Sequence, residues 1–320
     1  MVGHGLLYKE WKQNQGMYIG TIIALSLFIP FRLLIDYFSW KEYTEVSRSS
    51  HPLVFQFNNE PFIGIAAIIA GIMAILLIGI ERSKGTLDYT LSLPYKRSGI
   101  FMTKFALGFA VLIGSIGISY LLSSLIIWGM GAEANYFHIY YLYCIISAAM
   151  IFTLVLAAGA LTGNPFAQAL VAFSTAILPW MLFFLIGMHI YMFSGEPSFF
   201  NDDTLWIIAI SPITYFVFHQ PWILQAEIFI PVGMIILFFI IGLLAFMKHP
   251  NERNGYFFLW KQLNLPVQIL VMILGIMGFG ISGFTTSGES LGGYLIGGFI
   301  GALIGFLLGY FLIYKKGKRS

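Results

Sequence analysis

Histidine and cysteine residues able to carry out catalysis or bind a metal are few in this chain, and their spacing fits no metal-binding motif. The six histidines lie far apart, without the spacing of a metal site: His4, His51, His138, His189, His219 and His249. Cys144 is the single cysteine, so neither an internal disulfide nor a cysteine-based metal site can form. There is also no phosphate-binding loop. The sequence therefore predicts no catalytic residue, no metal site and no cofactor held by this chain, which is not expected to be an enzyme.

Ionisable residues are also missing from the middle of the long apolar runs. No Asp or Glu lies near the centre of any of them. Buried ionisable residues mark proton relays and ion-coupled carriers, so the pattern argues against both. His189 lies near the outer end of the fifth apolar run, where it either contacts a transported substrate or packs at an interface.

The composition is that of an integral membrane protein. Of the 320 residues, 58% are hydrophobic and only 10% are charged, with a mean hydropathy of +0.84. Soluble domains carry about 25% charged residues. The net charge of +3 gives no support to a nucleic-acid partner.

A polar, basic stretch from Glu81 to Lys104 interrupts two apolar runs and organises the rest of the chain. Apolar and polar residues mix over residues 86–93, and Pro94 ends the segment because proline lacks the N–H of a helix interior. This pattern predicts a short amphipathic helix at the cytosolic membrane face, which either rests on the membrane or fits a groove on a soluble partner.

The same stretch resembles the first cytosolic loop of ABC-2-type transporter permeases. The shared pattern is a Glu, Gly-Thr-Leu with an acidic residue, a Leu-Ser-x-Pro turn, an Arg, and a Lys at the start of the next helix. Here it comprises Glu81, Gly85, Thr86, Leu87, Asp88, Leu91, Ser92, Pro94, Arg97 and Lys104. The resemblance implies a coupling helix at 81–99, with these residues apart from Ser92 docking on a separate ATPase chain that would hold ATP and Mg. The alternative is an ordinary basic loop on the inner side of the membrane.

The apolar runs predict an all-α membrane protein with eight spans. A run of about 20 apolar residues crosses a hydrocarbon core about 30 Å thick. The expected spans are 16–35, 61–80, 100–128, 139–161, 169–193, 231–247, 266–284 and 291–314. Asn59 is a candidate N-cap for the second span, and Gly163-Asn164-Pro165 should break the helix before the fifth.

Two further segments are expected not to cross. Residues 1–15 form an amphipathic interfacial helix, with Leu7 and Trp11 on the apolar face and Glu10 on the polar one. It matches the elbow helix that the resemblance implies. Residues 205–218 are apolar but interrupted by Ser211-Pro212 and too short to span, which predicts a re-entrant or interfacial hairpin on the outer side.

The charges support this topology independently. With both termini and the loops at 81–99, 162–168 and 248–265 inside, 14 of the 17 Lys and Arg residues are inside and ten of the 14 acidic residues are outside. This agrees with the positive-inside rule. The expected organisation is an interfacial helix at 1–15, a six-span permease core at 16–247, and a cytosolic loop with a C-terminal helix pair at 248–320.

Two spans carry patterns of their own. The eighth has glycines at four-residue intervals, which predicts a close packing face toward either the seventh span or another chain: Gly293, Gly297, Gly301, Gly305 and Gly309. The fifth is rich in aromatic residues and interrupted by proline. The resemblance implies that such a helix lines the pathway or meets the dimer axis, whereas composition alone also fits a lipid-facing helix: Pro179, Trp180, Phe183, Phe184 and Met188.

The loop at 251–258, Asn-Glu-Arg-Asn-Gly-Tyr-Phe-Phe, and the start at 6–14 resemble a Gram-positive subgroup of this family, the Ytr-type permeases. The family implies a multi-pass cell-membrane subunit with cytosolic termini, paired with ATPase subunits and with an identical or related permease, that exports an amphiphilic compound such as an envelope-active peptide or lipid-like molecule. The alternatives are an ion-coupled secondary transporter and a non-transporting scaffold or sensor.

Overall fold

The computed structural model describes residues 2–47, 52–57, 61–195, 209–217, 228–248, 250 and 253–314. Within these residues eight helices are long and apolar enough to cross a membrane, which confirms the predicted number. They are α2 (Gln15–Ser47), α3 (Phe62–Ala74) with its extension to Ser83, α6 (Arg97–Met130), α7 (Phe137–Leu161), α8 (Pro165–Ser194), α12 (Phe229–Met247), α13 (Asn264–Thr286) and α14 (Leu291–Tyr314).

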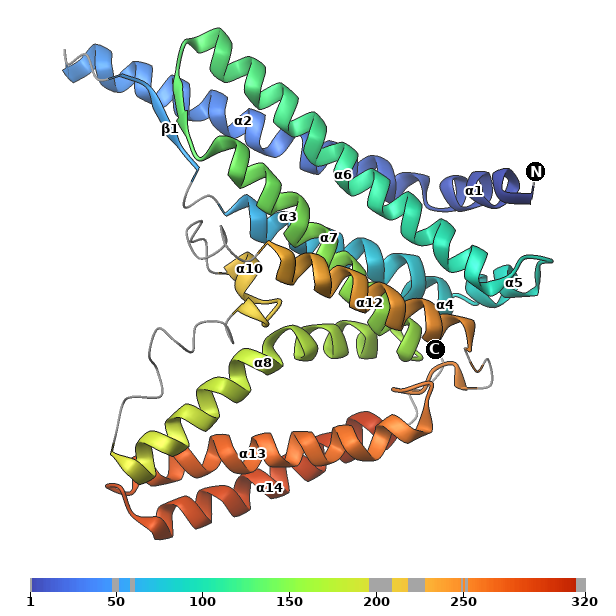
Figure 1. The fold of residues 1–320 in the computed structure, drawn as a ribbon, viewed down its shortest axis with the longest axis vertical. Coiled ribbons are helices and arrows are strands. Elements are labelled where there is room, and N and C mark those ends of the chain that lie inside the picture. Colours follow the sequence, from blue (N-terminus) through green and yellow to red (C-terminus); the bar gives the residue numbers. More distant parts are fainter. Residues whose placement is uncertain are drawn as a thin grey trace.

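The shorter elements lie at the two ends of this bundle. At one end are α1 (Val2–Gln13), α4 (Glu81–Ser83), α5 (Thr86–Ser92) and the 3₁₀ turn η5 (Lys261–Leu263). At the other, β1 (Val54–Gln56) pairs in parallel with β2 (Glu133–Asn135), a two-stranded ribbon that the all-α prediction did not include. The ends of α1 and α14 lie on the same side as α5 (Figure 1).

The core of the molecule is built around α7. The most apolar window of this helix is 89% buried, whereas no other candidate span exceeds 56%. It packs against α3, α6, α8 and α12 (Figure 1). A helix that is apolar on every side and rich in alanine suits this position, since small side chains allow close helix approach.

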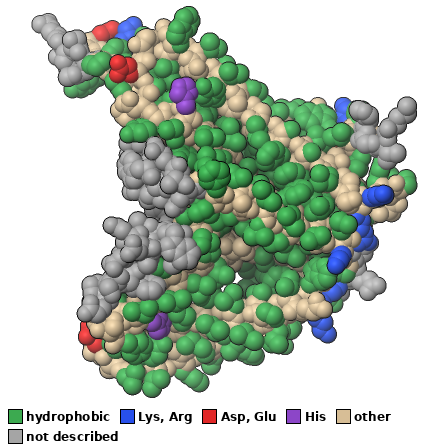
Figure 2. All heavy atoms as spheres, in the orientation of Figure 1, with side chains coloured by type: hydrophobic (Ala, Val, Ile, Leu, Met, Phe, Trp, Pro, Cys, Tyr) green, Lys and Arg blue, Asp and Glu red, His purple; other side chains and the backbone are tan. Residues whose placement is uncertain are grey.

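The charged side chains are divided between the two ends of the bundle. On the face shown in Figure 2, most Lys and Arg gather at the end that carries α5, and Asp and Glu lie toward the opposite end. This distribution agrees with the cytosolic side predicted from the charges, while the orientation itself stays a prediction.

The observed helix bounds differ from the predicted ones where polar residues continue a helix. The first span runs on to Ser47, far beyond the predicted end at residue 35. The tripeptide 163–165 was predicted as a helix break, but only its first two residues form the turn. Asn164 caps α8 by accepting a hydrogen bond from Ala167 N at 2.7 Å, and Pro165 occupies the first turn, where proline's missing N–H costs nothing.

Part of the predicted outer hairpin is described. In the stretch 205–218, residues 209–217 include the single-turn helix α10 (Thr214–Val217), and the rest lies outside the described residues, as does Asn59. Ile213 N donates to the Ala176 carbonyl of α8 at 3.2 Å, and Ser147 Oγ of α7 donates to the Tyr215 carbonyl at 3.0 Å. Protein groups thus form hydrogen bonds with the backbone of this irregular segment, as a segment inside a membrane would require. The re-entrant path itself stays a prediction.

The N-terminal helix differs from its predicted orientation. Glu10, assigned to the polar face, is fully buried together with Leu6, whereas Leu7 is exposed. The side of α1 that contains Leu6 and Glu10 packs on α6. Backbone hydrogen bonds continue through Asn14 into α2, from Asn14 N to Glu10 O and from Tyr18 N to Asn14 O. The interfacial position of this helix stays a prediction.

The glycines of α14 face α13. A Cβ built on Gly301 would lie 2.1 Å from the Gly275 carbonyl oxygen, and one on Gly297 would lie 2.2 Å from the Phe279 carbonyl oxygen. A Cβ on Gly293 would lie 2.5 Å from the Gly283 carbonyl oxygen, one on Gly305 2.9 Å from Met272 Cα, and one on Gly309 3.1 Å from Gln268 Cγ. Of the two partners considered for this face, the structure places the seventh span against it.

We expect Gly301→Ile to force α13 and α14 apart, because its side chain would overlap backbone atoms. Overpacking of this kind costs about 1–3 kcal/mol or more. Gly292→Ile is the matched control, since nothing lies within 4 Å of a Cβ at that position. Thermal unfolding of the detergent-purified variants should show a lower midpoint for Gly301→Ile alone. Equal midpoints would contradict the close packing.

Candidate functional site

The predicted coupling segment forms a short helix that stands at one end of the bundle. The extension of α3 ends at Ser83, and Gly85 turns the chain with φ +74°, a left-handed conformation that favours glycine. The helix α5 then covers Thr86–Ser92, and Leu93 in extended conformation precedes Pro94. The sequence pattern of glycine, short helix and proline is therefore present as a turn–helix–turn unit.

Only part of the predicted docking set is accessible. Leu87, Glu81 and Lys104 are buried, each at most 4% exposed, so their side chains offer nothing to a partner. The exposed residues of the segment form one surface: Ser83, Lys84, Gly85, Asp88, Tyr89, Ser92, Pro94 and Lys96. Thr86, Leu91 and Arg97 are half-buried. Tyr89, which the resemblance did not single out, is 66% exposed and is the largest side chain on this surface.

Beneath this helix lies a buried ion cluster, which we define as Lys9, Glu10, Glu81 and Lys104. Lys104 Nζ of α6 is 2.7 Å from Glu10 Oε2 of α1 and 2.6 Å from Glu81 Oε2 of α4. Lys9 Nζ lies 3.1 Å from Glu10 Oε1 and is partly exposed. The two carboxylates and two ammonium groups balance in charge. Three helices far apart in sequence are held together at this point.

Hydrogen bonds extend the buried ion cluster to α5. Lys9 Nζ donates to Thr90 Oγ1 of α5, and Thr86 Oγ1 donates to the Glu81 carbonyl at 3.0 Å. Asn14 Nδ2 donates to Glu81 Oε1 at 2.8 Å. Because Leu87 and Thr90 are also buried, α5 is attached to the bundle along one face and presents the other.

Arg82 joins the same region to the central helix. Its Nη1 donates to the Gly159 carbonyl at 2.7 Å and to the Thr162 carbonyl, both at the C-terminal end of α7. A cation at this position satisfies carbonyls that have no partner inside the helix and interacts favourably with the helix dipole. Arg82 therefore joins the α4–α5 segment directly to the end of α7.

A π-helical segment precedes these residues. The helix changes to η1 (Ile75–Ile80) at Ala74, whose carbonyl accepts a hydrogen bond from Gln168 Nε2 at 3.1 Å. Gln168 Nε2 also donates to the Val155 carbonyl at 3.0 Å, and its side chain is fully buried. Gln168 of α8 therefore donates to the Ala74 carbonyl at the point where the α-helix widens into η1. Such segments often occur at functional sites.

The predicted pathway residues lie on α8, which diverges from the core. Its N-terminal part packs on α7 and its other end approaches α13 (Figure 1). Trp180 and Phe184 stack with centroids 5.9 Å apart, while Phe183 is buried. Met188 lines a hollow of about 190 Å³ between α8 and α13. Pro179 lies inside the helix, close to the Ala176 carbonyl that accepts from Ile213. A path through this helix stays a prediction.

His189 packs at an interface in this structure. Its Nδ1 lies 2.7 Å from the Leu185 carbonyl oxygen, and its Nε2 lies 3.1 Å from the Tyr294 hydroxyl of α14. The imidazole therefore joins the outer end of α8 to the C-terminal helix pair, which agrees with the second of the two interpretations considered for it.

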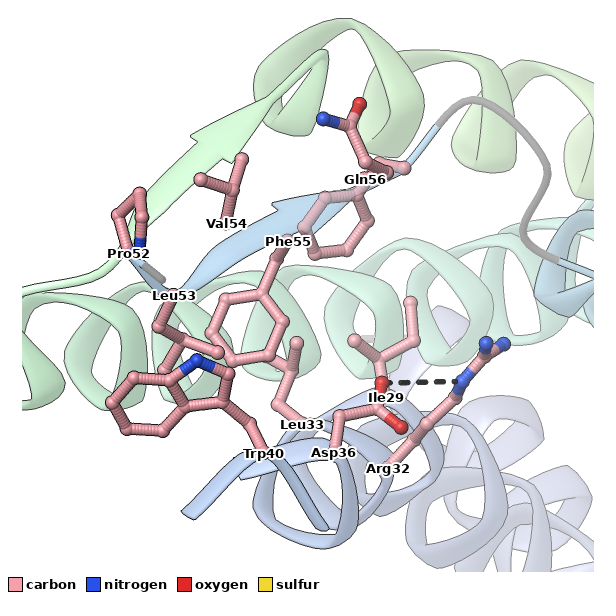
Figure 3. A pocket seen from close by; sticks show the side chains of 11 residues that line it. Ile29, Arg32, Leu33, Asp36, Trp40, Pro52, Leu53, Val54, Phe55 and Gln56 are labelled. Atoms are coloured by element: carbon pink, nitrogen blue, oxygen red, sulfur yellow. Dashed lines mark ion pairs between the residues drawn. The ribbon is translucent and has the colours of Figure 1, made fainter. Parts of the chain in front are cut away.

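A larger hollow opens at the end of the bundle opposite α5. It has a volume of about 400 Å³ and lies between α2 and β1. Figure 3 shows Leu33, Trp40 and Phe55 turned toward one another, beside the pair formed by Arg32 Nε and Asp36 Oδ2, 3.7 Å apart. The lining is thus mostly apolar, with one ion pair at its side.

These features agree with what is found among known proteins. A family model described as ABC-2 family transporter protein matches residues 8–190, more than half of the chain. The chain belongs to the ABC-2 family of transporter proteins. No solved structure matches it.

Two relatives in this family align with the whole chain. It is 45% identical to "Probable ABC transporter permease YtrD" of Bacillus subtilis (strain 168), over 99% of each protein. It is 42% identical to "Probable ABC transporter permease YtrC" of the same organism, over 99% of this chain and all of the relative. The resemblance to Ytr-type permeases is therefore confirmed. Permeases are membrane subunits that are not themselves catalytic, so the chain is not an enzyme.

Sequence reasoning had missed Lys9, Glu10, Asn14, Arg82 and Gln168. Leu6, Glu10 and Asn14 recur at four-residue spacing, which was the available signal for a buried face on α1. Asn14 bonds Glu81, 67 positions away, and Glu10 pairs with Lys104, 94 positions away, so no local pattern could assign these contacts. Because Glu81 and Lys104 lie so far in sequence from their partners in residues 10–14, the sequence pattern assigned both of them to docking instead.

We expect Lys104→Met to destabilise the fold, because it leaves Glu10 and Glu81 buried without their shared cation. Breaking a buried ion pair from one side costs about 3–5 kcal/mol. Lys96→Met removes an exposed lysine a few residues earlier and should change little. The test is the yield of monodisperse protein after detergent extraction, together with the thermal unfolding midpoint. A Lys104→Met variant as stable as Lys96→Met would show that the cluster does not hold the helices together.

Proposed function

We propose that this chain is the membrane subunit of an ABC transporter in which a separate ATPase chain docks on the exposed side of α5. The observation that carries the proposal is the two-sided construction of this helix. Leu87 and Thr90 fasten one side to the bundle, while Tyr89 and Ser92 project from the other. A docking element must be both accessible and rigidly attached if a partner's movement is to reach the membrane.

The proposed coupling follows the contacts beneath α5. When ATP closes the ATPase pair, α5 moves with it, and the buried ion cluster transfers the displacement to α1 and α6. Arg82 transfers it to the end of α7. ATP shifts the equilibrium only if the ATPase contacts α5 differently in the two states. ATP and Mg would be held by the ATPase, and this chain would hold no cofactor.

The second partner is proposed to be another permease, identical or related. The chain is similar at nearly the same level to two different permeases of one organism, which is expected where such permeases occur as related pairs. The subunit would lie in the cell membrane with both termini in the cytosol, because the basic end of the bundle carries α5, the start of α1 and the end of α14 (Figures 1 and 2).

The proposed cargo is an amphiphilic compound that is exported, such as an envelope-active peptide or a lipid-like molecule. Support comes from the apolar and aromatic character of α8 and from the mixed lining of the hollow beside Arg32 and Asp36. An ion-coupled carrier would instead need a titratable carboxylate at mid-bilayer. The buried carboxylates Glu10 and Glu81 lie at the α5 end of the bundle and are paired with Lys104.

We expect Tyr89→Ala to weaken ATPase docking while leaving the fold intact, because an exposed aromatic residue is the usual anchor of such an interface. Truncation of an anchor costs about 2 kcal/mol or more, a loss of at least about 30-fold in affinity. The tagged chain is purified from its native membranes, and the ratio of co-purified ATPase to permease is measured together with ATP hydrolysis. Tyr136→Ala, an exposed tyrosine at the other end of the bundle, is the matched control.

Leu87 is unsuitable for this test although the sequence pattern named it as a docking residue. It is fully buried, so Leu87→Asp is expected to damage the fold rather than report on docking. Undiminished ATPase binding by a stable Tyr89→Ala variant would overturn the assignment of this surface. The absence of any ATP-hydrolysing partner from the wild-type preparation would overturn the proposed function itself.

A further inference from the structure

The cytosolic segment between α12 and α13 lies across the α7–α8 turn. Gly255 N donates to the Gly163 carbonyl at 2.9 Å, Gly163 N donates to the Phe257 carbonyl at 3.2 Å, and Leu259 N donates to the Leu161 carbonyl at 3.0 Å. Thr162 and Phe258 form an antiparallel bridge. Three backbone hydrogen bonds thus fasten residues 255–259 to the end of the central helix.

The close approach depends on a glycine. A Cβ on Gly163 would lie 2.3 Å from the Tyr256 carbonyl oxygen, so any side chain there would separate the two segments. Phe257 and Phe258 are buried with Ala167 of α8 and Ile313 of α14. The segment is therefore attached to the core on one side and to the C-terminal helix pair on the other.

One side chain of this segment reaches the coupling helix. Asn254 Nδ2 donates to Asp88 Oδ1, in the first turn of α5, at 2.8 Å. Asn254 is only 9% exposed, and its Oδ1 has no hydrogen-bond partner within the described residues. Leaving a buried acceptor unsatisfied is unfavourable, so an apolar side chain would serve packing better here. An apolar residue could not form the hydrogen bond to Asp88, and this bond accounts for an asparagine at position 254.

We propose that Asn254 is a positioning residue that holds α5 in its docking orientation and connects it to the α13–α14 pair. The inference deepens the proposed function and rests on it. It also gives the two C-terminal helices a part in coupling: movement of α5 would pull on residues 253–259, which are anchored beside Ile313 of α14. Removing the amide would leave α5 attached by its other contacts but free to sample more orientations.

The test uses the full chain with Asn254→Leu, which keeps the size and burial of the side chain but cannot donate. Hydrogen exchange of the amides of residues 86–92 is measured without any partner. A hydrogen bond to a carboxylate is strong enough that its loss should raise exchange in α5 about tenfold. Asn264→Leu is the matched control, because Asn264 is also buried in this region with an unpartnered Oδ1.

Rescue of the pair is measured by the same hydrogen exchange of residues 86–92, without any partner. Asn254→Asp should raise this exchange about tenfold, because two carboxylates would face each other. Adding Asp88→Asn to it should return the exchange to the wild-type level, since one amide and one carboxylate would be paired again. An Asn254→Leu thermal unfolding midpoint equal to that of the wild-type chain would show that the change in α5 comes from lost positioning and not from a less stable fold.

Wild-type exchange in α5 together with wild-type ATPase binding in Asn254→Leu would overturn the inference and leave the proposed function standing. An equal increase of hydrogen exchange in α5 caused by Asn264→Leu would also overturn the inference, because any change in the segment would then loosen α5. If the wild-type chain binds no ATPase, the proposed function fails, and the coupling role of Asn254 fails with it.

Discussion

The position of α5 depends on one lysine held between two carboxylates. Burying Lys104, Glu10 and Glu81 costs desolvation free energy that their attraction repays only when the geometry is good and the remaining hydrogen-bonding groups are satisfied. The structure meets this condition with Lys9 and Asn14, which supply the further donors. Such a cluster does little for net stability, but it tolerates few other arrangements of the helices. Its effect is to fix where α1, α4 and α6 meet, and hence where α5 stands.

Contacts from two other segments meet at the end of the central helix. The central helix α7 is contacted at its end by Arg82 from one side and by the 255–259 segment from the other. Both sets of contacts end on backbone carbonyls or amides of residues 159–163, at the turn into α8. Under the proposed coupling, a displacement of α5 would reach the turn between two spans. The outer half of α8, which contacts the C-terminal pair through His189 and Tyr294, lies beyond that turn.

The sequence predicted the spans well and the contacts poorly, for a physical reason. Apolar length reports directly on the membrane, so α14 was predicted with its observed bounds, and the glycine spacing indicated its packing face. Amphipathic periodicity shows that a helix has two faces but not what covers each of them. Leu87 and Glu81 were accordingly assigned to a partner protein, whereas α6 and α1 cover them. Glu10 was placed in solvent because a carboxylate normally lies there, and its cation is 94 positions away.

The wide turn of η1 has a consequence for how this chain can vary. A π-helical segment contains one residue more than the α-helix it replaces, and each residue rotates an α-helix by about 100°. Glu81 and Arg82 follow directly after it, so their directions toward Lys104 and toward the end of α7 depend on that added residue. Point substitutions along the lipid-facing side of α3 are compatible with this arrangement. Deleting a single residue between Ile75 and Ile80 would swing both charges away from their partners, so the length of this helix is more constrained than its composition.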